Sequence, residues 1–144
     1  MKKDVKRLIF LVDDDALYLK SLELEFLDCP EYEIMSFATG ELCVENLEHK
    51  PEIIILDYLL DGVNKSAMNG LKTLDKIKVY NANIQVIILS AQDKIEVAVN
   101  CMKHNAYDYI VKSETANFRL KKAIKTILKN KKLEDTLNWY MDNV

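Results

Sequence analysis

Glycine, proline and cysteine are scarce in this sequence. Its 144 residues include three Gly, two Pro and three Cys, so most turns have to be made by Asn, Asp and Ser. Cys29, Cys43 and Cys101 form no CxxC pair, which argues against the usual zinc sites and disulfide frameworks. We interpret them as small buried residues of a protein in the reducing cytoplasm.

Long apolar runs and a strong excess of one charge are also absent. The longest candidate for a membrane span, Leu8–Val12, is far shorter than the ~20 residues that a spanning helix needs. The formal net charge of −3 gives no reason to expect a nucleic-acid or membrane surface. With 49% hydrophobic and 30% charged residues, the composition is typical of a globular domain with a normal core.

Five short apolar runs recur along the chain, with helical patterns between them. The runs are Leu8–Val12, Tyr32–Phe37, Ile53–Leu56, Val86–Leu89 and Tyr107–Val111. Most are rich in Ile, Val and Leu with little polar alternation, which is typical of strands covered on both faces. The second run is weaker and is interpreted as an edge strand. The alternation predicts an α/β fold, a doubly wound five-stranded parallel sheet of flavodoxin-like order 2-1-3-4-5.

Apolar residues at helical spacing mark the helix between each pair of predicted strands and the helix after the last one. In chain order these residues are Leu17, Leu22, Leu24 and Phe26; Leu42, Val44 and Leu47; Leu71, Leu74 and Ile77 after a start near Gly70; Ile95, Val99 and Met102 within 94–104; and Leu120, Ala123, Ile124, Ile127 and Leu128.

The tail after Asn130 follows a different pattern. Leu133, Leu137 and Tyr140 repeat at helical spacing, but out of phase with the preceding helix. We therefore expect a domain over 1–130, followed over 131–144 by either a C-terminal helical extension or the beginning of a linker.

Polar side chains stand directly after four of the predicted strands. Asp13, Asp14 and Asp15 follow the first strand, and Asp57, Ser90 and Lys112 follow the third, fourth and fifth. In an open parallel sheet, binding sites form at the carboxyl ends of the strands beside the switch in strand order. These side chains can therefore meet in one pocket.

Such a group of side chains suits phosphoryl transfer. Clustered carboxylates need protons or a cation to offset their repulsion, and Mg²⁺ is commonly held by a few carboxylates together with phosphate oxygens. A carboxylate can act as a nucleophile toward phosphorus, while an ammonium and a hydroxyl neutralise charge on the phosphoryl oxygens. Here these groups are Lys112 and Ser90. The simpler alternative is that the aspartates cap the first helix, as we expect for Asp15.

Four stretches together resemble the receiver domain of two-component response regulators. They are 8–15 (LIFLVDDD), 53–57 (IIILD), 87–91 (IILSA) and 107–112 (YDYIVK), and the similarity covers about residues 6–130. The resemblance implies that Asp57 is the phosphoacceptor, served by a sensor histidine kinase or a phosphotransfer protein in the cytoplasm. It implies at most slow autodephosphorylation, so the chain is not expected to be a turnover enzyme.

The same resemblance assigns roles to the neighbouring residues. Asp13, Asp14, Asp57 and the backbone carbonyl of Leu59 would hold Mg²⁺. Ser90 and Lys112 would contact the phosphoryl group, and small Ala91 would leave room for it. Tyr109 matches an aromatic switch position that turns inward when Ser90 moves toward phosphate; the alternative is a plain half-buried strand aromatic.

The sequence departs from the family pattern after the phosphoacceptor. The family usually has a short loop with Pro leading to a Gly, whereas here Gly70 lies thirteen positions beyond Asp57 with no Pro between them. We interpret 58–69 as containing an insertion of about five residues, an ordinary length for a functional loop.

Three other functions are compatible with parts of this sequence. A magnesium-dependent phosphatase of the haloacid dehalogenase type needs a second acid two positions after the nucleophile, where this chain has Leu59. A receiver that only binds proteins would not need the full set of site residues. The basic stretch over 119–132 is interrupted by core positions, so it is interpreted as a solvated face or a docking surface. The fourth and fifth helices are the candidate surface for a homodimer, and we expect no direct contact with nucleic acid or membrane.

Overall fold

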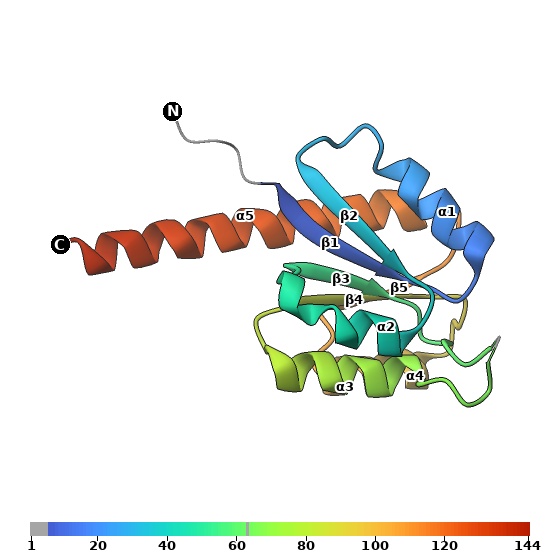
Figure 1. Cartoon of the computed structure of the whole chain (residues 1–144). Helices are drawn as coiled ribbons and strands as arrows, with labels where there is room; N and C mark the ends of the chain where they lie inside the picture. Colours follow the sequence, from blue (N-terminus) through green and yellow to red (C-terminus); the bar gives the residue numbers. More distant parts are fainter. Residues whose placement is uncertain (1–5, 63) are drawn as a thin grey trace. The chain divides into compact units, whose positions relative to one another are not determined.

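The computed structural model (Figure 1) describes residues 6–62 and 64–144 and contains one five-stranded parallel sheet. The strands are β1 (Arg7–Val12), β2 (Tyr32–Phe37), β3 (Ile53–Leu56), β4 (Gln85–Ser90) and β5 (Asp108–Val111). Their order is β2-β1-β3-β4-β5. The predicted α/β fold, the flavodoxin-like order and the edge position of β2 are confirmed.

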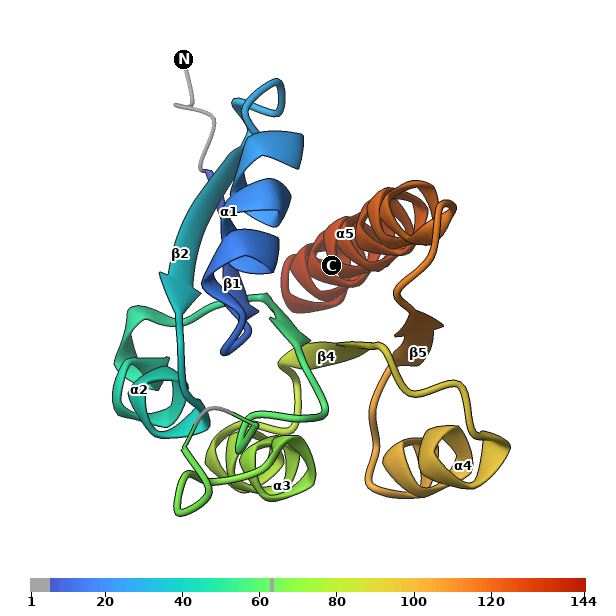
Figure 2. The same ribbon diagram turned by 90° about the vertical axis from the view of Figure 1, so that its right-hand side faces the viewer.

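The chain divides into two compact units, residues 1–113 and 114–144. The first unit holds the sheet together with α1 (Ala16–Glu25), α2 (Gly40–Glu45), a 3₁₀ turn (Leu47–His49), α3 (Gly70–Tyr80) and α4 (Ile95–Lys103). Figure 2 shows α1 on one face of this sheet and α2, α3 and α4 on the other. All four residues of β3 are buried, as expected for a central strand of a parallel sheet.

Helix α4 is present as predicted, but the apolar residues that marked it in the sequence lie on its outer side. Ile95 is 77% exposed, and Val99 and Met102 are each 45% exposed. The residues that pack against the core are instead Cys101, which is fully buried, together with Val97 and Ala98. Small residues at these positions let the helix backbone approach the sheet closely, and the larger apolar side chains are left on the outside.

In helices α1 and α2, too, only some of the apolar residues that marked the helix are buried. In α1, Leu22 and the following Phe26 are buried, whereas Leu17 and Leu24 are 84% and 57% exposed. In α2 the buried residues are Gly40 and Cys43, while Leu42 is 44% exposed. The expectation of buried cysteines holds for Cys43 and Cys101, but Cys29 is only partly buried.

The second unit consists mainly of α5, which runs from Ala116 to Asp142. Leu120, Ile124 and Ile127 are buried as predicted, and residues 132–144 are exposed. The helix has no break at residue 130, and the division into 1–130 and 131–144 stays a prediction. Within the two described ranges, none of the helices has both the length and the apolar composition that a membrane crossing requires.

Candidate functional site

Three carboxylates converge where β1 and β3 end. These neighbouring strands are in register with Val12 opposite Leu56, and the Asp57 backbone N–H donates to the Val12 carbonyl at 2.9 Å. One oxygen each of Asp13, Asp14 and Asp57 lies within 4.8 Å of the other two. Asp13 and Asp57 are only 2% and 7% exposed. The sequence prediction that these acids meet is confirmed.

The third aspartate after β1 has a local structural role. The Asp15 side chain accepts hydrogen bonds from the backbone N–H groups of Leu17 and Tyr18, both at 3.1 Å, and so caps α1 as predicted. The Asp15 N–H in turn donates to Asp13 Oδ1 at 2.9 Å. This hydrogen bond helps to hold the Asp13 carboxylate in its orientation beside Asp14 and Asp57.

Lys112 brings a positive charge to the carboxylates. Its Nζ atom lies 2.9 Å from Asp13 Oδ2, 3.6 Å from Asp57 Oδ2 and 4.0 Å from the centre of the Tyr18 ring. Its backbone N–H donates to the Ser90 carbonyl at 2.8 Å, which joins the ends of β4 and β5. Burial alone would lower the pKa of the Lys112 ammonium, but the contacts with Asp13 and Asp57 outweigh it, and the pKa is raised. The side chain therefore stays charged.

Asp57 is held in an unfavourable environment for a carboxylate. Burial is the main cause that raises its pKa from 3.8 to about 7, and the negative charge of Asp13 adds to it. Lys112 and the backbone N–H of Leu59 offset only part of this effect. A hard divalent cation among these oxygens would relieve the repulsion, so the donor set fits Mg²⁺.

A cavity of about 530 Å³ opens beside the carboxylates. Its lining includes both Leu59 and Ala91, as the sequence analysis expected. The full lining is Asp14, Asp15, Ala16, Asp57, Leu59, Gly62, Ala91 and Lys112. The room beside Asp57 is of the size that small-molecule and phosphoryl ligands occupy.

Ser90 and Tyr109 are buried and are not part of the cavity lining. Ser90 is fully buried, and its Oγ accepts from the Gln92 N–H at 3.1 Å. The Tyr109 ring is 9% exposed, and its hydroxyl donates to the Gln92 carbonyl at 2.6 Å. Burial raises the pKa of this hydroxyl. Both side chains are thus hydrogen-bonded to the backbone of Gln92, in the segment that follows β4.

The long segment after Asp57 is closed at its base by Gly70. The Gly70 N–H donates to the Tyr58 carbonyl at 2.9 Å, and a Cβ atom at Gly70 would lie 2.5 Å from the carbonyl oxygen of Asp57. Near its end, the Met68 N–H donates to the Glu41 carboxylate at 3.0 Å. The described part of the loop, which excludes residue 63, is therefore tied to α2.

Sequence reasoning missed Tyr18 and Glu41. Tyr18 lies three residues after the helix cap Asp15, on the first turn of the helix that begins at this edge of the sheet, and this spacing could have suggested it. For Glu41 the sequence offers no signal, because its partner Met68 is 27 residues away.

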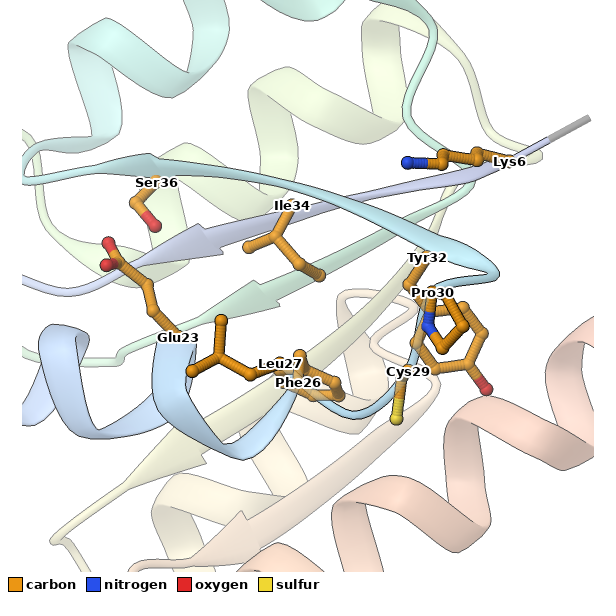
Figure 3. A pocket seen from close by; sticks show the side chains of 9 residues that line it. All are labelled: Lys6, Glu23, Phe26, Leu27, Cys29, Pro30, Tyr32, Ile34 and Ser36. Atoms are coloured by element: carbon orange, nitrogen blue, oxygen red, sulfur yellow. The ribbon is translucent and has the colours of Figure 1, made fainter.

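A second hollow, drawn in Figure 3, lies between α1 and the edge strand β2. Side chains such as Phe26, Leu27 and Ile34 line it, with Lys6 and Glu23 among them. Its lining includes none of the residues predicted to hold Mg²⁺ or to contact a phosphoryl group. The predicted chemistry is therefore concentrated at the cavity beside Asp57.

Comparison with known proteins agrees with this site. Residues 9–125 match the family described as "Response regulator receiver domain". The chain is 30% identical over 104 residues to the transcriptional regulatory protein ZraR of Klebsiella oxytoca, and 28% identical over 125 residues to the luminescence regulatory protein LuxO of Vibrio campbellii. These alignments cover 72% and 81% of this chain but 22% and 26% of the relatives, so the chain spans about a quarter or less of their length.

Solved structures show the same fold. The signal receiver domain of a putative LuxO repressor protein from Vibrio parahaemolyticus has a TM-score of 0.80 and 30% identity, with 92% of this chain and 98% of that one covered. A CheY-like receiver domain protein from Methanospirillum hungatei has a TM-score of 0.74 at 23% identity, over 88% and 98% of the two chains.

Proposed function

The chain belongs to the response regulator receiver domains of two-component systems, and from this we propose that Asp57 is its phosphoacceptor. A carboxylate oxygen of Asp57 would attack phosphorus, and the bond between phosphorus and the donor would break. For a phosphohistidine donor the leaving group is the imidazole nitrogen, and the product is an aspartyl-phosphate.

The observation that carries this proposal is the position of Lys112 between two buried carboxylates. Its ammonium lies within 4 Å of both Asp13 and Asp57, so it is placed to neutralise charge that develops on phosphoryl oxygens. Ala91 lines the cavity with a small side chain and leaves room beside Asp57.

Asp13, Asp14 and Asp57 supply the carboxylates of the proposed Mg²⁺ site, with the backbone carbonyl of Leu59 as a further ligand. The bound cation would neutralise negative charge on the carboxylates and on the phosphoryl oxygens. The side chain at position 59 is apolar and 41% exposed, so it offers no general acid for rapid ester turnover. This supports a phosphoacceptor rather than a turnover enzyme.

We propose that Ser90 and Tyr109 couple phosphorylation to the surface. Both are hydrogen-bonded to Gln92, so a movement of the Ser90 hydroxyl toward a phosphoryl oxygen would disturb the segment that also holds Tyr109. Phosphate would then shift the balance between two arrangements of this segment.

The partners and the location are proposed on the same basis. A sensor histidine kinase or a phosphotransfer protein would donate the phosphoryl group in the cytoplasm, whose reducing conditions suit the buried thiols of Cys43 and Cys101. Ile95, Val99 and Met102 give α4 an exposed apolar face, which supports a homodimer through α4 and α5. We propose no direct contact of this chain with nucleic acid.

Intact-mass measurement after incubation with acetyl phosphate and Mg²⁺ tests the function. We expect the wild type to gain one phosphoryl group and Asp57→Asn to gain none. Asp15→Asn is the matched control, because it makes the same chemical change beside the cavity, keeps the cap and should be labelled like the wild type. Equal labelling of Asp57→Asn would refute the assignment.

A further inference from the structure

The outer edge of β2 presents backbone groups that point away from the sheet. Within the described ranges, β2 pairs with β1 alone. The Phe37 carbonyl accepts a hydrogen bond from the Asp13 N–H at 3.1 Å, so the odd-numbered residues of this strand face β1. Alternate residues of a strand direct their N–H and C=O groups to opposite sides. Ile34 and Ser36 therefore turn theirs outward, where they can pair with an added strand.

The hollow between α1 and β2 lies beside this edge and has a volume of about 500 Å³ (Figure 3). Below it is called the β2 hollow. Phe26 and Leu27, which follow α1, and Ile34 of β2 supply its apolar lining. Leu27 is 76% exposed. Residues directly opposite each other on neighbouring strands place their side chains on the same face. A residue opposite Ile34 on an added strand would therefore place its side chain against this apolar lining.

The β2 hollow has an acid toward one end and a base toward the other. Figure 3 shows Glu23 toward the Ser36 end of the hollow and Lys6 toward the opposite end. Lys6 directly precedes β1, whose first residue pairs with Tyr32 at the beginning of β2. Glu23 lies 3.5 Å from Lys20 of the same helix, and such an exposed ion pair is weak. The Glu23 carboxylate can therefore also bind a cation in the hollow.

We propose that the outer edge of β2 is a docking site for a short extended segment of another protein, which adds to the sheet as an antiparallel strand. Antiparallel pairing is slightly more stable per residue than parallel pairing, and strand addition to an exposed edge is a general mode of peptide recognition. The segment carries an apolar side chain opposite Ile34. Two residues before it, a basic side chain opposite Ser36 reaches Glu23. Two residues after it, an acidic side chain reaches Lys6.

The charges around this edge favour such a segment over a second copy of the chain. Residues 21–37 contain five acids and no Lys or Arg. The acids are Glu23, Glu25, Asp28, Glu31 and Glu33, and the last three are exposed. Two copies joined through their β2 edges would bring two acidic segments together, and like charges on paired strands are destabilising. A segment with basic side chains avoids this repulsion.

The proposed docking site is separate from the phosphoacceptor site. The lining of the β2 hollow includes none of the residues proposed to bind Mg²⁺ or the phosphoryl group. Peptide binding can therefore be measured in Asp57→Asn as well as in the wild type. A failure of this inference can thus be told apart from a failure of the proposed function.

Amide chemical shifts measured by NMR test the proposal on the full 144-residue chain. The probe is the peptide acetyl-Lys-Thr-Leu-Lys-Glu-amide, whose first, third and fifth side chains lie on one face of a strand. Its second lysine would lie opposite the exposed Glu33. We expect a Kd on the order of a millimolar, because the interface is small. The amide signals of Ile34 and Ser36 should shift more than those of Glu33 and Met35, whose N–H groups face β1.

Matched controls separate the apolar and the charged contacts. The peptide acetyl-Glu-Thr-Leu-Lys-Lys-amide has the same composition with its end charges exchanged, and it should bind at least about fivefold more weakly. Leu27→Ser should weaken binding of the first peptide, whereas Leu24→Ser should not, because Leu24 is also exposed but does not line the hollow. Glu23→Lys should weaken it about fivefold more than Glu48→Lys, which makes the same charge change at an exposed turn away from the hollow.

Four results would overturn the proposal. The first is the absence of any shift at millimolar peptide, and the second is a set of shifts in which Glu33 and Met35 move as much as Ile34 and Ser36. The third is equal binding of the two peptides. The fourth is a wild type that dimerises by sedimentation equilibrium and becomes monomeric in Ile34→Lys, which would place a second copy of the chain on this edge.

Discussion

At the scale of single residues, the position of the Lys112 ammonium depends on a neighbour that carries no charge. The Tyr18 ring lies 4.0 Å from Nζ on the side contributed by α1, while Asp13 and Asp57 hold the same ammonium through their carboxylates. A cation above an aromatic face gains ~0.5–2 kcal/mol, depending on its exposure. We therefore regard Tyr18 as a positioning residue for Lys112.

Removal of the Tyr18 ring should slow phosphorylation. We expect Tyr18→Leu to lower the initial rate of labelling by acetyl phosphate roughly 3- to 10-fold, since the lost interaction is worth about 0.5–1.4 kcal/mol. Tyr18→Phe keeps the aromatic face and should stay close to the wild-type rate. Circular dichroism would verify that both variants fold. If Phe were as slow as Leu, the hydroxyl rather than the ring would be the important group.

The residues differ in how far the sequence could predict them. Asp13, Asp57 and Lys112 follow strands directly, so strand ends and sheet order were enough to bring them together. The contribution of Tyr18 depends on the direction in which α1 leaves the sheet. The contact of Glu41 with Met68 depends on the path of a loop for which the sequence provides no periodic pattern.

At the scale of elements, the loop after Asp57 and helix α3 meet at one point of close backbone approach. A Cβ atom at Gly70 would lie 2.5 Å and 2.6 Å from the carbonyl oxygens of Asp57 and Tyr58. Backbone atoms cannot move away as a flexible side chain could. Helix α3 can therefore begin beside the site only with Gly at this position.

Gly70→Ala should destabilise the fold and disturb the site together. We expect the free energy of unfolding in urea to fall by about 1–3 kcal/mol, the usual cost of overpacking, and the labelling rate of Asp57 to fall because its own carbonyl is displaced. Gly62→Ala is the control in the same loop, since a Cβ there would meet only a side-chain oxygen of Asp14, at 3.2 Å. It should change the free energy of unfolding by less than about 1 kcal/mol. Equal losses in the two variants would contradict this account.

Helix α4 shows why a sequence predicts buried strands more readily than the inward faces of helices. A buried parallel strand such as β3 is apolar on both faces. Its apolar run therefore predicts a strand without any need to know which face points to which helices. In α4 the apolar residues surround much of the helix, and Ile95 and Val99 form as regular a stripe as the residues that pack inward. The small side chains of Ala98 and Cys101 determine which face packs inward, because they let the helix approach the core closely. The spacing of apolar residues in the sequence does not reveal this effect of side-chain size.

At the scale of the whole molecule, the carboxylate cluster links folding stability to pH. The Asp57 pKa is raised from 3.8 to about 7, first by burial and then by Asp13, so the folded state binds more protons than the unfolded chain between these pH values. The free energy of unfolding should therefore fall as pH rises through this window. Asp57 would contribute up to about 4 kcal/mol to this fall.

Mg²⁺ should reverse this loss, because it binds the folded, deprotonated site and stabilises the folded state by mass action. Without Mg²⁺, we expect the wild-type Tm to fall between about pH 5 and pH 8 relative to Asp57→Asn, which lacks the titrating carboxyl and should be more stable by roughly 10 °C at pH 8. Millimolar Mg²⁺ should raise the wild-type Tm more at pH 8 than at pH 5.

Asp14→Ala should keep the pH-dependent fall and lose the response to Mg²⁺. Thermal unfolding followed by circular dichroism measures all three proteins. An equal Mg²⁺ response in wild type and Asp14→Ala would place the cation elsewhere, since Asp14 contributes one of the three clustered carboxylates.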